Sequence, residues 1–311
     1  MKHTGLALVI GGILLIPARS QTESTPFLGR WDITVKTPNS SYPGWLEVVQ
    51  QNGALQGRYQ PRGGSVHPVE MKLEGSRLNV VLSASSTTHP NATSWDLAIE
   101  GNGLAGVEKH GDTVAAQIAG VRAPELKRAA PKSWMKPEAI FNGKDLTGWE
   151  PSNPATNHWV AEDGVLLNQS KGANLRTTRK FDDFKLHIEF NCPQDGNSGI
   201  YLRGRYEVQV EYEPLDANDK YHSIGSIYGF IAPSVDLPRT PGQWETFDIT
   251  LVGRTLTVMR NGKTTIDHQE IPGITGGALD SNESEPGPFY LQGDHTGGMK
   301  YRNITVSLPA R

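Results

Sequence analysis

Short runs in which apolar and polar residues alternate, separated by turns that contain glycine, recur through residues 27–120. Alternation with a period of two is the pattern of a β-strand with one buried face, because successive side chains point to opposite sides of a sheet. Asn52-Gly53 is the strongest turn signal and favours a tight hairpin. These observations predict a small up-and-down antiparallel β-barrel, or a strongly curved sheet, with strands at 30–35, 45–50, 54–59, 69–73, 78–82, 95–100, 104–108 and 113–118.

Residues 122–138 differ in composition from the region before them. This segment, RAPELKRAAPKSWMKPE, contains three prolines and five basic residues, which favours an extended connector exposed to water. We therefore expect a domain boundary here, with an N-terminal β domain over 25–121 and a second domain over 139–311. A chain of 311 residues is long enough for two domains that each bury a core.

The second region, from Ala139 onward, also reads as strands. Its clearest run is FKLHIEF at 184–190, in which every second residue is apolar. Roughly ten such runs without a convincing helix are typical of a two-sheet jelly-roll sandwich. The sequence therefore predicts an all-β protein, in which a small lipocalin-like barrel precedes the sandwich. The lipocalin-like part of this prediction rests on Gly29-x-Trp31, which resembles the opening of those barrels.

The first twenty residues have the features of a secretory signal peptide. Lys2 and His3 form a basic start, and 5–16 is an apolar stretch. Ala18-Arg19-Ser20 then places small residues at both positions that the peptidase reads. The apolar stretch is too short to span a bilayer comfortably, so we expect no membrane span. We expect cleavage after Ser20 and export to the periplasm or out of the cell.

The charge balance argues against a nucleic-acid partner. The formal net charge is -3, charged residues make up 20% of the chain, and no basic patch stands out. Cys192 is the single cysteine of the sequence, so no disulfide can form within the chain. We interpret Cys192 as a small residue at a strand end rather than as a nucleophile, because a reactive thiol needs positive surroundings.

A second hairpin signal, GNSGIYLRGRYEVQVEY at 196–212, carries an unusual density of polar groups. Gly204-Arg205 predicts a tight turn between its two strands. Alternation puts Glu207 and the two polar residues that follow it, Gln209 and Glu211, on one face of the second strand. In this arrangement we expect Arg203 to lie beside Glu207 on the same polar face.

Two interpretations of this polar face are open. Antiparallel sheets normally carry a solvated polar face, and a cross-strand pair of Arg and Glu is often ordinary surface. Asn197-Ser198-Gly199, however, is a small, turn-prone triplet that lets a ligand approach the backbone closely. We therefore predict that the hairpin forms the floor of a binding site.

A series of motifs follows through the second region: FNGKDLTGWE (141–150), Trp159 with a DG turn after it, LRTTRKFDDFKLHIEF (175–190), GNSGIYLRG (196–204), YEVQV (206–210), Tyr228-Gly229, Trp244, and LQGDH (291–295) followed by YRNI (301–304). Over residues 139–308 this series resembles the 3-keto-disaccharide hydrolase family, long catalogued as a bacterial domain of unknown function. The resemblance implies a concanavalin-A-like jelly roll and cleavage of glycosides already oxidised to a ketone at C3. The chain departs from the family pattern at Glu211-Tyr212, where Asp is frequent, and at Thr296, which separates His295 from a glycine.

A ketone at C3 acidifies the hydrogen on C2, so the C1 substituent can leave by elimination before water adds back. This route needs a general base near C2, a positive or hydrogen-bonding group at the ketone oxygen, and an acid for the leaving group. We expect Glu207 or His295 to act as base or acid, and Arg203 to stabilise the developing oxyanion. The residues that we expect to bind the substrate are Asn197, Gln209, Gln292, Glu189, Trp159 and Tyr228.

Cofactor and partner expectations follow from the same chemistry. Glu189 and His187 share the polar face of a neighbouring strand and are candidate ligands for a divalent ion that would polarise the ketone. Two such residues do not make a complete metal site, and no other cofactor is implied. The metabolic partner that the resemblance implies is a sugar 3-dehydrogenase upstream, because the ketone has to be formed first.

Two other functions remain open on the sequence. Glu207-Val-Gln209-Val-Glu211 resembles the E-x-D-x-E strand of laminarinase-like retaining glycosidases, with Gln in the middle position. Retention needs two carboxyl groups about 5–5.5 Å apart, whereas residues four apart on a strand are roughly 13 Å apart at Cα. The other alternative is a non-catalytic, lectin-like carbohydrate-binding protein, because a fold does not determine a function.

Export is the expectation that is simplest to test. N-terminal sequencing of the protein recovered from the extracytoplasmic fraction should begin at Gln21 or within a residue or two of it. Recovery of an intact Met1 in that fraction would contradict the signal-peptide interpretation.

Overall fold

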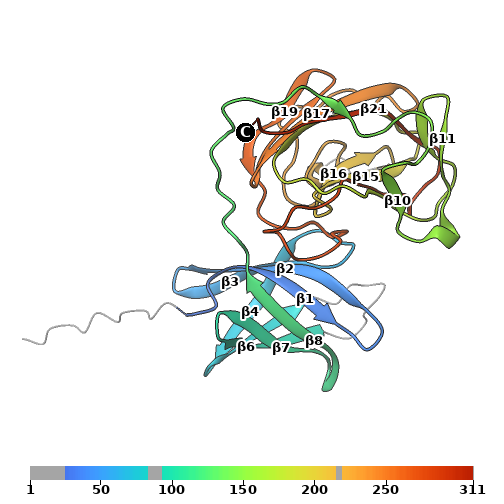
Figure 1. Ribbon diagram of the computed structural model, residues 1–311. Coiled ribbons are helices and arrows are strands. Elements are labelled where there is room, and N and C mark those ends of the chain that lie inside the picture. The colour runs from blue at the N-terminus through green and yellow to red at the C-terminus, as the bar shows by residue number, and fades with distance from the viewer. Residues whose placement is uncertain (1–24, 83–92, 215–218, 311) are drawn as a thin grey trace, which may run out of the picture.

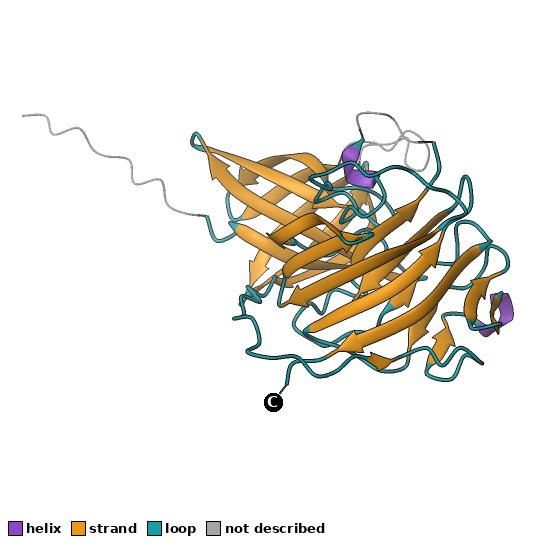
Figure 2. Ribbon diagram, turned by 90° about the horizontal axis from the view of Figure 1, so that it is seen from above, coloured by secondary structure: helices purple, strands orange, loops and turns teal. Residues whose placement is uncertain are grey.

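The computed structural model describes residues 25–82, 93–214 and 219–310, so the expected signal peptide at 1–20 lies outside the described residues. The described chain forms a β-barrel, blue to teal in Figure 1, followed by a β-sandwich, green to red. In these ranges the helical segments are the short 3-10 turns η1 (Pro154–Thr156) and η2 (Lys220–His222), purple in Figure 2. The all-β prediction is therefore confirmed. Among the described residues, none of the helices has the length and apolar character needed to cross a bilayer.

The barrel consists of consecutive antiparallel strands, and β1 pairs with β8 to close it. Asn52 and Gly53 both have positive φ, at 52° and 80°, so the predicted hairpin turn forms at these residues. The barrel prediction is thereby confirmed. The strands are β1 (Gly29–Lys36), β2 (Ser41–Gln51), β3 (Ala54–Gln60), β4 (His67–Glu74), β5 (Arg77–Leu82), β6 (Thr93–Glu100), β7 (Gly103–His110) and β8 (Thr113–Arg122).

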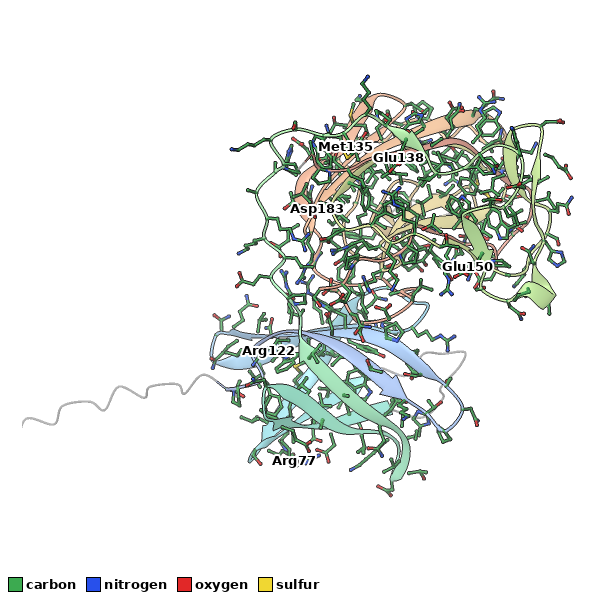
Figure 3. The ribbon with its side chains drawn as sticks, in the orientation of Figure 1. Arg77, Arg122, Met135, Glu138, Glu150 and Asp183 are labelled. Atoms are coloured by element: carbon green, nitrogen blue, oxygen red, sulfur yellow. The ribbon has the colours of Figure 1, made fainter. Side chains whose placement is uncertain are left out.

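One cation–aromatic contact ties the first strand of the barrel to the last. The guanidinium carbon of Arg122 lies 3.7 Å from the centroid of the Trp31 ring, and Trp31 is fully buried. Arg122 also donates hydrogen bonds to the backbone carbonyls of Leu28 and Pro26. Figure 3 labels Arg122 where the chain leaves the barrel. Because an arginine can stack on a ring and donate in the plane at the same time, it covers this end of the barrel core.

The sandwich has two antiparallel sheets, a five-stranded and an eight-stranded one, in the described part of the chain. The five-stranded sheet has the order β10 (Trp149–Pro151), β13 (Leu175–Thr177), β20 (Tyr290–Leu291), β15 (Asn197–Leu202) and β16 (Tyr206–Glu211). The eight-stranded sheet has the order β11 (Trp159–Glu162), β12 (Val165–Asn168), β21 (Met299–Ser307), β14 (Phe184–Asn191), β17 (Trp244–Val252), β18 (Thr255–Arg260) and β19 (Lys263–Glu270), with β9 (Glu138–Ala139) beside β21.

The sandwich core lies between these two sheets. Phe184, Leu186, Ile188 and Phe190 of β14 are all buried, and Lys185 between them is exposed, so the alternation read from the sequence is the alternation in the fold. The connector at 122–138 meets this domain at the eight-stranded sheet. The Met135 amide donates to the carbonyl of Leu308 at 2.8 Å, and β9 pairs with β21. Figure 3 labels Met135 and Glu138 on this segment.

The barrel and the sandwich share a buried interface. Trp45 of β2 points out of the barrel, is fully buried, and packs edge-on against Phe230 at 5.3 Å between ring centroids. It is part of the apolar cluster that forms the sandwich core. A Cβ at Gly273 would lie 2.2 Å from the indole nitrogen of Trp45, so a glycine is needed at this contact.

Polar residues of β1 also take part in the contact between the barrel and the sandwich. Arg30 of β1 forms an ion pair with Glu270 of β19 at 2.7 Å. The buried carboxyl of Asp32, the cross-strand neighbour of Trp45, lies near Glu283. Burial, together with this second carboxylate, raises the pKa of Asp32 to about 10. Asp32 is therefore protonated at neutral pH, which avoids the cost of two like charges in a dry interface.

We expect Trp45→Ala to weaken the protein at this interface. Removal of a fully buried indole should cost about 3–5 kcal/mol in the free energy of unfolding, because the space it leaves is only partly refilled. The measurement is denaturant unfolding at neutral pH. Val49→Ala on the same strand, where the valine is 42% exposed, is the control and should change stability little. Equal effects of the two changes would contradict the interface role of Trp45.

Candidate functional site

The hairpin at 196–212 folds as two paired strands, β15 and β16. Its register sets Tyr201 opposite Glu207, Gly199 opposite Gln209, and Asn197 opposite Glu211. Tyr206, Val208, Val210 and Tyr212 point into the sandwich core, as expected from alternation. The opposite face is polar but is not solvated surface, because Glu207, Gln209 and Glu211 are all buried.

The expectation that Arg203 lies beside Glu207 is wrong. The turn begins at Arg203 itself, whose φ is 51°, and the cross-strand partner of Glu207 is Tyr201. The Arg203 side chain is fully buried, where it donates to Asp182 at 3.0 Å and to the Tyr206 hydroxyl at 2.9 Å. A one-residue shift of the turn removed this arginine from the polar face, so Arg203 supports the hairpin and does not line the pocket.

A pocket of about 380 Å³ lies over the polar face of the hairpin. Its volume is near the small end of the range for small-molecule sites. The hairpin, the 291–295 motif, the segment before β17 and a loop of the barrel all contribute to its walls. The lining residues are Gly63, Asn197, Tyr201, Glu207, Gln209, Glu211, Glu213, Pro214, Asp219, His222, Tyr228, Gly277, Gln292 and His295.

Glu207 is a buried carboxyl group at the base of this pocket. Burial raises its pKa to about 7, while side-chain hydrogen bonding to Tyr201 and the charge of His295 act in the opposite direction. The carboxyl packs over Gly199, where a Cβ would lie 2.2 Å from Glu207 Oε1. The glycine of the Asn197-Ser198-Gly199 triplet thus makes room for this carboxyl group, in addition to any room it leaves for a ligand.

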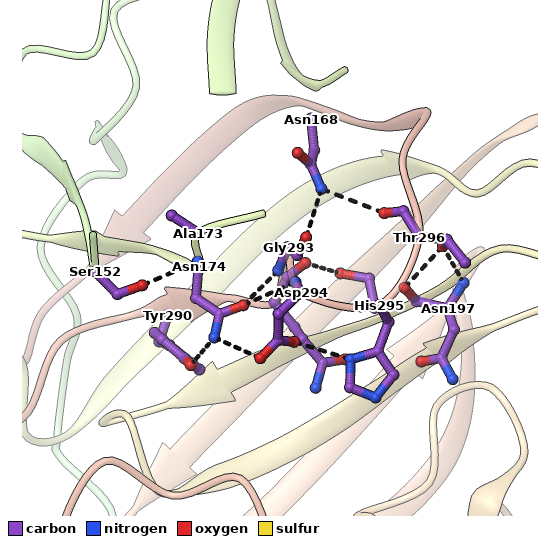
Figure 4. Close-up of polar contacts among 12 residues, drawn as sticks. Ser152, Asn168, Ala173, Asn174, Asn197, Tyr290, Gly293, Asp294, His295 and Thr296 are labelled. Atoms are coloured by element: carbon purple, nitrogen blue, oxygen red, sulfur yellow. Dashed lines mark hydrogen bonds and ion pairs between the residues drawn. The ribbon is translucent and has the colours of Figure 1, made fainter. Parts of the chain in front are cut away.

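His295 faces Glu207 from the loop that follows β20. Its Nδ1 lies 2.8 Å from Asp294 Oδ1, and hydrogen bonding to this carboxylate raises the pKa of His295. Asn174 holds Asp294 in turn, with its amide nitrogen 3.1 Å from Asp294 Oδ2. Figure 4 shows this chain of contacts from Asn174 through Asp294 to the imidazole. The arrangement favours a cationic imidazole beside a carboxylate whose pKa is close to neutrality.

Thr296 also acts in this loop, although it departs from the family pattern. Its hydroxyl accepts from the Asn197 amide at 2.8 Å and donates to the Asn197 carbonyl at 3.0 Å. These two bonds, drawn in Figure 4, join the start of β15 to the residue that follows His295. Thr296 therefore holds the loop that carries His295 against the hairpin by two hydrogen bonds.

The amide side chains of the pocket leave hydrogen-bonding capacity free for a ligand. The side-chain oxygens of Gln209 and Gln292 are buried, and no described residue donates a hydrogen bond to them. Gln209 donates its own amide hydrogen to Glu211, whose pKa is raised by burial. Asn197 donates to Glu213 at 3.1 Å. A sugar hydroxyl group is the kind of donor that would satisfy the two free glutamine oxygens.

The free edge of β16 brings further side chains to the pocket. The segment 224–231 pairs with this edge: the Tyr228 amide donates to the carbonyl of Glu207 at 3.1 Å, and the Gln209 amide donates to that of Ser226 at 3.0 Å. His222 and Tyr228 are thereby placed in the wall with ring centroids 4.6 Å apart. Tyr228 was among the residues expected from the sequence.

Seven pocket residues were not singled out from the sequence: Gly63, Tyr201, Glu213, Pro214, Asp219, His222 and Gly277. Strand alternation contained a signal for Tyr201, because it lies two residues from Gly199 on the same face. No sequence signal places His222 or Asp219 here, since both precede the segment that pairs with the edge of β16.

Besides Arg203, three residues expected at the site lie elsewhere. Glu189 and His187 are on β14 of the eight-stranded sheet. Glu189 forms an ion pair with Arg302 at 2.6 Å, and His187 Nδ1 lies 2.7 Å from Asp248 Oδ1. Trp159 is buried in the core and donates to the Ala173 carbonyl at 2.8 Å. None of the three lines the pocket. Within the described ranges, His, Cys, Asp and Glu side chains form no group of three or more that could hold a metal ion.

Cys192 follows β14 directly and is buried. Burial raises the pKa of its thiol to about 12. The thiol therefore stays protonated at neutral pH, whereas a nucleophilic cysteine needs to form the thiolate.

Comparison with known proteins gives related sequences and structures. The chain is 28% identical over 96 residues to a 3-keto-disaccharide hydrolase of Bacteroides thetaiotaomicron, and the match covers 27% of this chain and 32% of that relative. Thus the chain spans about a third of the length of the curated relative that it matches.

Two crystal structures from Parabacteroides distasonis ATCC 8503, each described as a "putative glycosyl hydrolase", are also similar to this chain. The first has a TM-score of 0.47 and 29% identity, covering 58% of this chain and 93% of that one. The second has a TM-score of 0.45 and 18% identity, covering 56% of this chain and 94% of that one.

The family resemblance read from the motifs is confirmed by a match over most of the sandwich. Residues 136–307, more than half of the chain, match the family described as 3-keto-alpha-glucoside-1,2-lyase-like domain. The barrel lies outside the matched range. By this match, the chain belongs to the 3-keto-alpha-glucoside-1,2-lyase-like domain family.

Proposed function

We propose that this protein is an exported enzyme that cleaves the glycosidic bond of 3-keto glycosides or disaccharides. The reaction begins with removal of the proton on C2 and expulsion of the C1 substituent, and ends with addition of water. The observation that carries the proposal is that two groups of suitable charge line the same pocket: Glu207, a buried carboxyl group with a pKa of about 7, and His295, an imidazole whose pKa is raised. A base and a cation in the same pocket are what α-proton abstraction beside a ketone requires.

The steps balance without an oxidant or a reductant. The base takes the C2 proton, and the electron pair of that bond enters an enolate whose charge lies on the C3 oxygen. The enolate then collapses to restore the C3 carbonyl and form the C1–C2 double bond, and the C1–O bond breaks as the leaving oxygen takes a proton from the protonated base or from water. Addition of water across this double bond restores a 3-keto sugar with a free hydroxyl at C1.

We assign the proton abstraction to Glu207. A carboxyl group with a pKa of about 7 is substantially ionised near neutral pH and is still a stronger base than an exposed carboxylate. We assign the stabilisation of the enolate oxygen to His295, in place of Arg203, which is bonded to Asp182 and Tyr206 away from the pocket. Asp294 supports this role, because it holds His295 in position and favours its protonated form.

Substrate hydroxyl groups have candidate partners around this pair. The free side-chain oxygens of Gln209 and Gln292 can accept hydrogen bonds, and Asn197 and Tyr228 lie in the same pocket. The family description and the name of the Bacteroides relative both refer to 3-keto sugars, which supports the choice of substrate class. Because the substrate carries a ketone, a reaction that oxidises C3, such as that of a sugar 3-dehydrogenase, must precede this one.

We expect Glu207→Gln to lower kcat on a 3-keto disaccharide by roughly 10²–10⁴-fold, because it keeps the shape of the side chain and removes the proton acceptor. Steady-state rates measured with matched 3-keto and unmodified disaccharides test this change. Glu162→Gln, at an exposed glutamate on β11, is the matched control and should keep the wild-type rate. Wild-type activity in Glu207→Gln would remove Glu207 from the mechanism.

Deuterium at C2 of the substrate separates elimination from direct displacement at C1. Elimination should exchange the label with solvent, or give a primary isotope effect if proton removal limits the rate. Full retention of the label with no isotope effect would contradict elimination and favour a retaining mechanism through Glu207 and Glu211. Binding of the sugars without cleavage of any 3-keto substrate would instead favour a lectin-like role.

The pH dependence of kcat/KM should report the ionisation of Glu207. Because the base must be deprotonated and its pKa is about 7, kcat/KM should fall about tenfold for each pH unit well below 7 and level off above it. Activity should fall again at higher pH as His295 loses its proton. Glu207→Gln should lack the acidic limb in its residual activity. A profile that is flat from pH 5 to pH 7 would contradict the assignment of Glu207 as the base.

A further inference from the structure

A loop of the barrel forms part of the pocket wall. This loop, residues 61–66, joins β3 to β4, and Gly63 within it lines the pocket together with Gly277 of the sandwich. The Gly63 amide donates to the carbonyl of Gly276 at 2.7 Å, so the two domains meet at the rim through their backbones. The family match begins at residue 136 and does not include this loop.

Glycines in the sandwich allow the barrel loop to approach this closely. A Cβ at Gly276 would lie 2.6 Å from the carbonyl oxygen of Gly64, and a Cβ at Gly229 would lie 3.1 Å from the Cα of Ser65. Gly229 follows Tyr228, which itself lines the pocket. Contacts this close leave no space for a side chain, so the loop is packed against the sandwich and held at the pocket.

The loop also supplies a side chain that holds a histidine of the pocket. The Ser65 hydroxyl is hydrogen-bonded to Nε2 of His222, and Nδ1 of His222 is hydrogen-bonded to Asp219. In the neutral imidazole, a carboxylate at Nδ1 favours the proton on Nδ1, and the Ser65 hydroxyl is then the donor to Nε2. The ring of His222 is therefore fixed from both sides, once by the sandwich and once by the barrel.

The two histidines of the pocket lie on opposite sides of the hairpin. His295 follows β20, which pairs with β15. His222 packs against Tyr228, in the segment that pairs with the free edge of β16. The proposed function puts the ketone ring beside Glu207 and His295. The side of His222 and Tyr228, where the barrel loop packs against Gly229, is then left for the group that departs from C1.

We infer that the N-terminal barrel is part of the substrate site: its 61–66 loop forms the wall of the leaving-group subsite, and Ser65 is a positioning residue for His222. The assignment of this subsite to the leaving group rests on the proposed function, whereas the contact between Ser65 and His222 does not. The barrel thereby determines which leaving groups fit, and the sandwich carries the reacting pair.

Ser65, His222 and Asp219 have the same types of side chain as a nucleophilic triad. Ser65 itself, however, does not line the pocket, whereas His222 and Asp219 do. The hydroxyl group is turned to the imidazole from the side of the barrel and is not presented to a ligand. This placement assigns Ser65 the role of orienting the ring.

Substitution of Gly63 tests the subsite. Gly63 has a φ of +66° and a Cβ there meets no atom within 4 Å, so Gly63→Asn adds a side chain at the rim without a clash, and asparagine accepts this backbone conformation. We expect Gly63→Asn to lower kcat/KM about tenfold for a 3-keto disaccharide, a loss of the size caused by a poorly fitting group. For the methyl 3-keto glycoside, whose leaving group is small, we expect less than about a twofold change by the same argument.

The matched control is Gly75→Asn, in the turn between β4 and β5. Gly75 also has a positive φ, at +60°, and open space at its Cβ, but it does not line the pocket. This variant should have the wild-type kcat/KM for both substrates. Equal loss on both substrates in Gly63→Asn, or no loss on either, would contradict the leaving-group subsite.

Ser65→Ala tests the positioning role without any substrate. In the full chain labelled with 15N-histidine, the Nε2 resonance of His222 should shift, because its hydrogen-bond donor is removed, and the resonance of exposed His268 should not. Ser40→Ala, at an exposed serine of the barrel, is the control and should leave His222 unchanged. An unchanged His222 spectrum in Ser65→Ala, or covalent labelling of Ser65 by a fluorophosphonate, would overturn the positioning role.

The two experiments separate the inference from the proposed function. If the wild type cleaves no 3-keto glycoside, the proposed function fails, and the histidine spectrum still reports whether the barrel holds His222. If cleavage occurs and the His222 resonance does not respond to Ser65→Ala, the proposed function stands and the inference fails. Where both hold, Ser65→Ala should raise KM for the disaccharide more than it lowers kcat, because the hydroxyl positions a binding group.

Discussion

The structure of the site depends on the burial of one tryptophan of the barrel in the core of the sandwich. Trp45 leaves the barrel surface and becomes part of the apolar cluster between the two sandwich sheets and their loops. The apolar area that it removes from water favours the association of the two domains. Glycines at 273 and 276 let the backbones close around this contact. With the barrel docked in this way, its 61–66 loop lies at the pocket.

Docking of the barrel helps to bury the polar face of β16, and burial changes how its carboxyl groups ionise. An open strand face would expose Glu207, Gln209 and Glu211 to water, and their carboxyl groups would titrate as ordinary acids. Here the face is covered by the loop that carries His295, by the segment that pairs with the edge of β16, and by the barrel. Burial then raises the pKa of Glu207 to about 7, which is the property that suits a base near neutral pH.

Much of the fold was predictable because strand alternation is a local property. The barrel hairpins, the inward face of β14 and the shared face of Glu207, Gln209 and Glu211 all follow from a period of two. Arg203 shows the limit of this reasoning. A turn that begins one residue earlier moved its side chain from the polar face to Asp182, and alternation contains no information on where a turn begins. For the same reason the pairing of Glu207 with Tyr201 required the register.

The sequence by itself determined which residues share a strand face, the all-β class and the family motifs, since each depends on neighbours along the chain. Only the tertiary structure decided what each face meets. It placed Glu189 and His187 on β14, where they contact Arg302 and Asp248 and not the pocket. It also brought His222 and Ser65 together from two domains, 157 residues apart. Contacts between such distant segments depend on how complete domains pack, and burial, which shifts the pKa of Glu207, exists only after that packing.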